Sequence, residues 1–578
     1  MLNLASITKP TWLITTALLS LNLLQQASAA PNQIRLNQLG FTPESTKTAV
    51  INNTDSQSFS IIDIASGKSV YQGQLSQSAL WPSSGETVKL AKFDDFTNLG
   101  RYHIQVKELE QSLPFTIDNS RYQQPLIDVI RAYYFNRSGA VIQKKYAGKY
   151  ARPAAHPDTI VYVHESAATE ARPAGTVISS PKGWYDAGDY NKYIVNSNIS
   201  VYTLLSALTE HENALESLKL NIPESSNNLP DFVDEILWNI DWMLTMQDPN
   251  DGGLYHKLTT KRFTGETQMP HHMDQPRYVV AKSTAASLGY AATMAKASTV
   301  LAKYEQQLPG YSQKLLTSAK QAWQWALINP AIHYEQPADI ATGAYATAGD
   351  DLKDEWLWAK SELFAATGDK QYLADIAFPE NLRIPEWDKV ETLALFTFAS
   401  NLNTPADIRD HALLKLTTVT NKWLTQGHNS AYGVAITPQD FVWGSNSNML
   451  NKAIMLLRVN QLQANPEYVH QANAIVDYIF GRNPLGMSYV TGVGQHTPMH
   501  IHHRVSMADG ITEPIPGFLV GGPQPGQQDA EHCTPQGGIY ASTKPALSYI
   551  DHGCSYASNE VTINWNAALV YALAALTE

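Results

Sequence analysis

The sequence predicts a small all-β sandwich of immunoglobulin type followed by a large all-α domain built as a closed ring of helix pairs. Three observations support this prediction. The chain has 578 residues, which is more than one hydrophobic core usually holds together. Short segments with strand-like alternation fill residues 30–118. Beyond Tyr122 the apolar residues instead recur at helical spacing towards the end of the chain.

In the predicted sandwich, residues 30–118, the strand-like segments alternate with turn signals. Ser66-Gly67-Lys68 and Leu99-Gly100-Arg101 mark two of these turns. About six or seven short strands in a segment of this length are typical of an immunoglobulin-like fold. The clearest strand segments are residues 33–37, 59–64, 87–90, 102–106 and 113–117.

The predicted all-α domain, residues 119–578, holds about a dozen helical segments separated by long loops rich in Gly, Pro, Asp and His. No repeat of about 20–50 residues is visible, so an ordinary solenoid is not expected. Paired helices with long loops favour a closed toroid with the functional site at one mouth. The helical segments are residues 125–136, 198–212, 230–246, 283–304, 311–327, 352–367, 390–401, 405–424, 447–462, 466–480 and 561–576.

Composition and the first residues indicate where the protein works. The formal net charge is −12, and hydrophobic residues make up 44% of the chain against 16% charged. This composition excludes a disordered chain, and the acidic balance argues against nucleic acid or an anionic membrane as a partner. Residues 1–29 are typical of a cleaved signal peptide, with Lys9, a short apolar stretch and Ala27-Ser28-Ala29 as the cleavage site. We expect a secreted or periplasmic protein that begins near Ala30.

The chain has only two cysteines, Cys533 and Cys554. In an oxidising compartment we expect them to form a disulfide, and two buried free thiols are the alternative. A disulfide that closes a loop of about 20 residues stabilises a protein by roughly 3 kcal/mol in the chain-entropy model.

Two carboxylates on a predicted turn are the first candidates for catalysis. Asp186 and Asp189 stand three positions apart in Gly183-Trp184-Tyr185-Asp186-Ala187-Gly188-Asp189-Tyr190. Neighbouring carboxylates repel when both are ionised, so one can stay an ion while the other positions water or shares a proton. The alternative is an Asx turn or a helix cap.

Glu560 is a further candidate, because it stands where a polar loop meets the apolar final helical segment. A carboxyl group packed by rings can have a raised pKa and act as an acid near neutral pH. Taken alone, Glu560 is better explained as an acid that complements the dipole at a helix N-terminus.

Several histidines form the third group: His496, His500, His502 and His503, followed by Arg504. Zinc is disfavoured, because Arg504 repels a cation and the spacing matches no zinc signature. We favour polar contacts to a hydroxyl-rich substrate, with ordinary loop histidines as the alternative.

An ordered series of segments resembles glycoside hydrolase family 9, the family of many cellulases. The series starts at Trp184-Tyr185-Asp186-Ala187-Gly188-Asp189-Tyr190 and ends at Asn559-Glu560-Val561, about 380 residues later. The N-terminal segment resembles the immunoglobulin-like domain found in one branch of this family. Between the two ends lie Leu229-Pro230-Asp231-Phe232-Val233-Asp234-Glu235-Ile236, Asp354-Glu355-Trp356-Leu357-Trp358-Ala359, Gly481-Arg482-Asn483-Pro484-Leu485-Gly486 and His502-His503-Arg504.

The resemblance implies an (α/α)6 barrel that hydrolyses β-1,4-linked glucan with inversion at the anomeric carbon. Asp189 matches the general base that activates water, and Asp186 matches its partner in holding that water. Glu560 matches the general acid. Inversion requires two separated carboxylates with a water between them. The implied sugar contacts are His503 and Arg504, with Tyr556 and Trp443 as looser candidates.

The resemblance also implies chemistry without a cofactor, although calcium is common in the family. Asp354, Glu355 and Asp388 match positions that supply calcium ligands, and helix-capping or paired acids are the alternative. The chain departs from the family pattern in residues 549–556, where an arginine and two acids are missing from the loop before Glu560. A second departure, Ala567-Ala568, replaces a usual Ala-Pro. These departures put the length and identity of the sugar substrate in doubt.

We therefore expect an endo-acting β-1,4-glucanase that acts as a monomer on cellulose, cello-oligosaccharides or related β-glucans. The alternative is an exo-acting β-glucosidase or exo-β-glucosaminidase on short oligosaccharides. A non-catalytic carbohydrate-binding barrel is disfavoured, because Asp186, Asp189 and Glu560 are all present.

Overall fold

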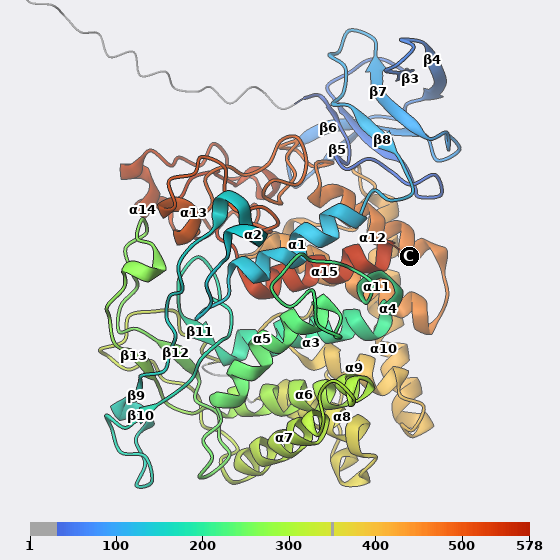
Figure 1. Cartoon of the computed structure of the whole chain (residues 1–578). Helices are drawn as coiled ribbons and strands as arrows, with labels where there is room; N and C mark the ends of the chain where they lie inside the picture. The colour runs from blue at the N-terminus through green and yellow to red at the C-terminus, as the bar shows by residue number, and fades with distance from the viewer. Residues whose placement is uncertain (1–31, 348–351, 578) are drawn as a thin grey trace, which may run out of the picture. The chain divides into compact units, whose positions relative to one another are not determined.

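The computed structural model describes residues 32–347 and 352–577, so the predicted signal segment lies outside the described residues. Figure 1 follows the chain from the blue strands of the first domain to the red helices near the C-terminus. Within the described ranges, no helix is both long enough and apolar enough to cross a membrane.

The first domain consists of two antiparallel sheets, ordered β1-β2-β6-β5 and β4-β3-β7-β8. In β7 the side chains of Tyr102, Ile104 and Val106 are buried, whereas the residues between them are partly exposed. This period of two is that of a strand with one face on a core, as the sequence predicted. The strands are β1 (Ile34–Arg35), β2 (Thr48–Asn52), β3 (Ser58–Asp63), β4 (Ser69–Gln74), β5 (Ala79–Trp81), β6 (Glu86–Lys92), β7 (Gly100–Val106) and β8 (Phe115–Ile117).

A closed inner ring of helices forms the centre of the second domain. Each inner helix contacts the next in the order α3, α6, α8, α9, α11 and α15, and α15 contacts α3 again. The inner helices are covered on most sides, and every residue of α15 from Ile563 to Ala574 is buried. The inner helices are α3 (Ile194–Glu210), α6 (Thr284–Leu301), α8 (Lys353–Thr367), α9 (Glu391–Ser400), α11 (Ser445–Leu462) and α15 (Ile563–Thr577).

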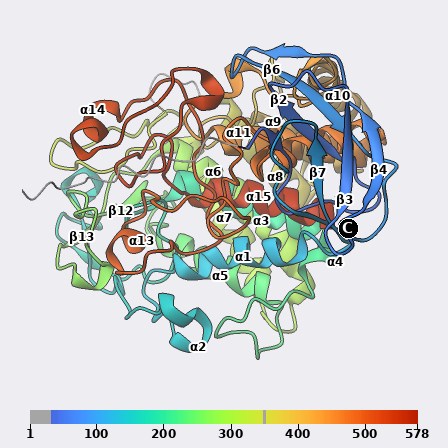
Figure 2. The same ribbon diagram turned by 90° about the horizontal axis from the view of Figure 1, so that it is seen from above.

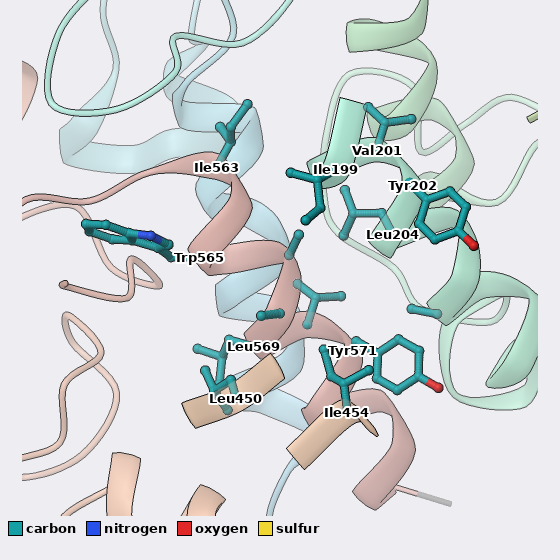
Figure 3. Close-up of a cluster of buried hydrophobic side chains, with 14 of the residues drawn as sticks. Ile199, Val201, Tyr202, Leu204, Leu450, Ile454, Ile563, Trp565, Leu569 and Tyr571 are labelled. Carbon is teal, nitrogen blue, oxygen red and sulfur yellow. The ribbon is translucent and has the colours of Figure 1, made fainter. Parts of the chain in front are cut away.

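Figure 3 shows how the ring closes between its first and last helices. Ile199 and Leu204 of α3 lie in one cluster with Ile454 of α11 and Leu569 of α15. Figure 2 labels the same three helices, α3, α11 and α15, in a view from above. Because α3 and α15 are neighbours, the loop before α3 and the loop before α15 open at the same place.

Some outer helices carry a single apolar stripe on the face that packs on the ring. In α7, for example, Leu315, Ala319, Ala322 and Ala326 are buried at helical spacing. Between α8 and α9, the described chain has only the short turn η5 (Lys370–Leu373) in place of an outer helix. The outer helices are α1 (Gln123–Phe135), α5 (Asp231–Thr245), α7 (Tyr311–Ile328), α10 (Ala406–Asn429) and α12 (Pro466–Ile479).

A small five-stranded sheet, ordered β10-β9-β13-β12-β11, is an addition that the sequence did not predict. Its strands are two or three residues long, too short to show a period. Strand β11 directly follows the Asp186–Asp189 turn, so this sheet positions the start of α3. The strands are β9 (Val161–Val163), β10 (Val177–Ile178), β11 (Lys192–Tyr193), β12 (Lys257–Thr259) and β13 (Arg277–Val279).

Candidate active site

One cavity of about 910 Å³ brings together the carboxylates that the sequence singled out. Asp186, Asp189 and Glu560 all line it. Asp186 and Asp189 precede α3 while Glu560 precedes α15, and the closure of the ring makes these two helices neighbours. The cavity is also lined by rings: Tyr193, Phe263, Tyr345, Trp387, Trp443, Tyr556 and Trp565.

Asp189 is buried and is held by two side-chain donors. The Asn191 amide donates to its Oδ2, and the Tyr193 hydroxyl lies 3.4 Å from the same oxygen. Asn191 is fixed in turn, because its Oδ1 accepts from the backbone N–H of Thr260 at 3.0 Å and from the Thr259 hydroxyl at 3.1 Å. The carboxylate of Asp189 therefore has a defined orientation toward the cavity.

Asp186 lies beside Asp189 and also accepts two side-chain hydrogen bonds. Asn196 of α3 donates to Oδ1 at 2.8 Å, and the Tyr345 hydroxyl donates to Oδ2 at 2.7 Å. Burial raises the pKa of Asp186 to about 7, and the neighbouring charge of Asp189 adds to the increase. Asp186 can therefore take up or release a proton near neutral pH.

Tyr345 reaches Asp186 from a backbone conformation that non-glycine residues rarely adopt, with φ of 48°. The loop before it is fixed, because Lys257 Nζ donates to the carbonyl of Gly343 at 2.6 Å and His256 Nε2 lies 2.7 Å from the carbonyl of Ala344. A strained backbone conformation of this kind persists only where contacts with the surrounding structure hold it in place. Tyr345 is thus held in position against the carboxylate.

The carboxyl of Glu560 accepts one hydrogen bond in the described chain, whereas that of each aspartate accepts two from side chains. The backbone N–H of Gly188 donates to Glu560 Oε1 at 3.3 Å, the one donor to this carboxyl among the described residues. Burial raises the pKa of Glu560 to about 8, and the charge of Asp189 adds to this increase whereas Arg504 opposes it. Glu560 is therefore protonated at neutral pH.

Gly188 is the point where the two carboxylate loops meet. A Cβ atom at this position would lie 2.2 Å from the backbone oxygen of His502 and 3.1 Å from Glu560 Oε1. Only glycine permits so close an approach. Arg504 ties the same point down, because its Nη1 and its backbone N–H donate to the Gly188 carbonyl at 2.9 and 3.0 Å.

The structure changes the assignment of the neighbouring histidines. His503, predicted as a sugar contact, is 1% exposed and does not line the cavity. Its ring nitrogens lie 3.0 Å from Ser506 Oγ and 3.2 Å from Asn136 Oδ1, so His503 supports the loop from behind. His502 lines the cavity instead, with Nδ1 2.6 Å from the Gly553 carbonyl. A carbonyl only accepts, so Nδ1 carries the proton and Nε2 is left as an acceptor.

The other three predicted sugar contacts all line the cavity: Arg504, Trp443 and Tyr556. Arg504 is buried beneath the ring of Phe263, with its guanidinium carbon 5.3 Å from the ring centre. Trp443 is 45% exposed, and its ring centre lies 5.6 Å from that of Tyr556 at an angle of 32°. Two such tilted rings at the edge of a cavity form an apolar platform on which a sugar face can stack.

The loop that leads to Glu560 is held by a disulfide and by a buried acid. Cys533 and Cys554 are joined, with their Cα atoms 5.3 Å apart. Asp529 is fully buried, and its Oδ2 accepts from the Ser555 hydroxyl and from the Ala557 backbone N–H, both at 2.7 Å. The loop therefore approaches Glu560 along a fixed path.

The described residues do not support the predicted calcium site at Asp354, Glu355 and Asp388. Arg383 Nη2 donates to Asp354 Oδ2 at 2.8 Å, so a guanidinium supplies the positive charge at this acid. Asp388 is paired with Lys389 at 3.6 Å. Among the described residues, no three His, Cys, Asp or Glu side chains are grouped so that they could hold a metal ion.

Sequence reasoning missed four residues that shape the site: Asn191, Asn196, Tyr345 and Asp529. Asn191 offered a local signal, because it follows Asp189 by two positions and amides often orient carboxylates. Tyr345 and Asp529 lie far along the chain from the carboxylates and backbone groups that they contact, so no local pattern points to them.

Comparison with known proteins identifies the family of the chain. Residues 122–573 match the model of glycosyl hydrolase family 9, and residues 29–111 match the cellulase N-terminal ig-like domain. A xyloglucan-specific endo-β-1,4-glucanase of Bacteroides ovatus is 42% identical over 94% of this chain and 93% of its own length. Endoglucanase D of Acetivibrio thermocellus is 33% identical over 94% of this chain and 83% of its own.

A solved structure of a Bacteroides ovatus family 9 protein superposes with a TM-score of 0.87 at 38% identity, covering 94% of this chain and 98% of that chain. Fold and sequence thus agree. The chain belongs to glycosyl hydrolase family 9, and it is a glycoside hydrolase with an N-terminal immunoglobulin-like domain.

Proposed function

We propose that this glycoside hydrolase cleaves β-1,4-glucan chains internally and with inversion. The observation that carries the proposal is that Asp189 and Glu560 line one cavity. Asp189 accepts hydrogen bonds from two side chains, whereas the carboxyl of Glu560 accepts one from a backbone N–H. Donors stabilise an ionised carboxylate, while burial without donors keeps a carboxyl protonated. This arrangement supplies a base and an acid at the same pH.

In the proposed mechanism, Asp189 accepts a proton from the water that attacks the anomeric carbon. Asp186 holds the second hydrogen of that water, and Tyr345 and Asn196 keep Asp186 in place. Glu560 donates its proton to the leaving glycosidic oxygen. Each carboxyl exchanges one proton and neither bonds to the sugar, so a single displacement inverts the configuration.

Features of the cavity also support an elongated substrate. Trp443 and Tyr556 offer stacking surface at its edge, and His502 Nε2 offers an acceptor for a sugar hydroxyl. An exposed platform beyond the carboxylates suits a chain that continues past the cut, which favours endo over exo action. Because the relative from Bacteroides ovatus is named for xyloglucan, we propose xyloglucan as the first polymer to test beside cellulose derivatives.

A time course of products on cellohexaose, carboxymethylcellulose, xyloglucan and chitosan oligomers tests the proposal. Early loss of viscosity with mixed oligosaccharides supports endo action on glucan. Release of monomer alone would favour the exo-acting alternative, and release of glucosamine would identify an exo-glucosaminidase. Proton NMR of the nascent product should show the α-anomer first, and an initial β-anomer would contradict inversion.

We also propose that residues 1–29 are removed during export to the periplasm or the medium, and that the mature enzyme works as a monomer. Sequencing of the mature N-terminus and sedimentation of the purified protein test these two points. A mature chain that still begins at Met1, or a stable dimer, would contradict them.

A further inference from the structure

Two further acids, Glu266 and Glu386, line the same cavity, and Glu386 has no part in the proposed proton transfers. It stands on a tight turn in which Glu386 and Lys389 exchange backbone hydrogen bonds of 3.0 and 3.1 Å. The turn is tied to α11, because Asn451 Nδ2 donates to the carbonyl of Pro385 at 2.8 Å. The backbone thus holds Glu386 firmly at the cavity wall.

One oxygen of the Glu386 carboxyl lacks a partner among the described residues. This oxygen, Oε1, is buried and accepts no hydrogen bond from any residue that the structure describes. Lys389, the cation of the same turn, is paired with Asp388 instead. A buried polar atom without a partner destabilises the fold, so such an atom needs an explanation. Its place in the substrate cavity suggests that the missing partner belongs to the ligand.

The neighbouring ring shows which part of the substrate reaches Glu386. Trp387 packs edge-on against Tyr345 with ring centres 5.1 Å apart, and Tyr345 donates to Asp186. Glu386 therefore lies along the wall that continues from the water-holding acid. In the proposed mechanism this acid faces the anomeric carbon, so the wall contacts sugars on the side of the cut that keeps that carbon.

We propose that Glu386 is a specificity-determining residue that accepts a hydrogen bond from a hydroxyl group of a sugar unit on this side of the cut. The proposal rests on the proposed function, because it assumes a β-glucan in the cavity. The hydrogen bond forms in the bound substrate and persists in the transition state. Its loss should therefore weaken binding while leaving the chemical step largely unchanged.

Steady-state kinetics on cellohexaose with three variants test the proposal. Glu386→Leu removes the acceptor, Glu386→Gln keeps an acceptor of the same shape, and Lys389→Gln is a control on the same turn. We expect Glu386→Leu to raise KM on the order of tenfold with kcat within about twofold, the effect of one hydrogen bond. Glu386→Gln should restore most of the loss, and Lys389→Gln should match the wild type.

Thermal unfolding of the same variants separates binding from a structural role. Glu386→Leu removes a buried unsatisfied oxygen, so its Tm should equal or exceed that of the wild type. An unchanged KM in Glu386→Leu overturns the proposal, as does a lowered Tm with KM and kcat altered together in both Glu386 variants. Wild-type enzyme that cleaves no β-glucan would instead refute the proposed function. The two failures are therefore distinguishable.

Discussion

The two sides of the catalytic cavity are built in different ways. On one side, Asp186 and Asp189 each accept hydrogen bonds from two side chains of neighbouring elements. On the other side, the carboxyl of Glu560 accepts one backbone hydrogen bond at 3.3 Å within the described chain. Glu560 can thus act as the proton donor opposite the two aspartates, because desolvation with few donors favours the neutral form of a carboxyl group.

Removing either carboxyl should have the largest effect. Asp189→Ala and Glu560→Gln should each lower kcat by about 10²- to 10⁴-fold, the usual contribution of one general acid or base. Circular dichroism should show both variants folded. Azide should partly rescue Asp189→Ala, because a small anion can enter the space of the lost base. Near-normal turnover in either purified variant would contradict the assignment.

The support of Asp189 can be weakened without touching the carboxyl itself. Asn191→Ala removes the amide that orients Asp189, and we expect kcat to fall about 10- to 100-fold, the range of a hydrogen bond to a charged group. Asn227→Ala is the matched control. It removes a hydrogen bond of 2.9 Å from the Asn227 side-chain amide to Asp234, and neither residue lines the cavity. Equal activity in both variants would show that the orientation of Asp189 is unimportant.

The pKa of Glu560 should set the alkaline limit of activity. The acid must be protonated to act, and its pKa in the free enzyme is raised to about 8, so kcat/KM should fall about tenfold per pH unit above that value. The same shift acts on stability. The folded state holds a proton that the unfolded chain releases near its ordinary pKa, so the contribution of Glu560 to stability is full below about pH 4.5 and is lost as the pH rises through about 8.

Thermal unfolding of the wild type and of Glu560→Gln between about pH 5 and about pH 8 tests whether the contribution of Glu560 to stability falls as the pH rises. The variant cannot ionise at this position, so its Tm should rise relative to that of the wild type as the pH increases from about 5 to about 8. A constant difference in Tm would show that the pKa of Glu560 is not raised.

Opening the disulfide in the loop before Glu560 should lower turnover less than removal of a catalytic carboxyl group does. Cys554→Ser opens the disulfide, and we expect the free energy of unfolding to drop by roughly 3 kcal/mol. Turnover should decrease by only about threefold to tenfold, because Asp529 still holds the loop through Ser555 and Ala557. Two titratable thiols in the unreduced wild-type protein would refute the disulfide.

The sequence was most informative where a pattern extends over many residues. Apolar residues at helical spacing predicted the helices of the ring, and β7 shows the alternation expected of a sandwich strand. Local patterns also singled out Asp186, Asp189 and Glu560, although the residues alone left structural alternatives open for each.

The rest of the site depends on contacts between distant segments, which a local pattern cannot report. Tyr345 meets Asp186 across 159 positions, and its positive φ has no counterpart in composition. The family likeness implied His503 as a sugar contact, whereas His502 lines the cavity. Sequence alone does not show which of two adjacent loop residues faces a cavity. The family likeness suggested calcium near Asp354, whereas the guanidinium of Arg383 stands there in the structure.

The closure of the helix ring bears on the activity of incomplete chains during synthesis. Gly188 and Glu560 are 372 positions apart, and they meet only when α15 packs between α11 and α3. During synthesis, the growing chain carries its base long before its acid exists. A chain that ends before Glu560 lacks the proposed acid, so we expect such shorter intermediates to be inactive.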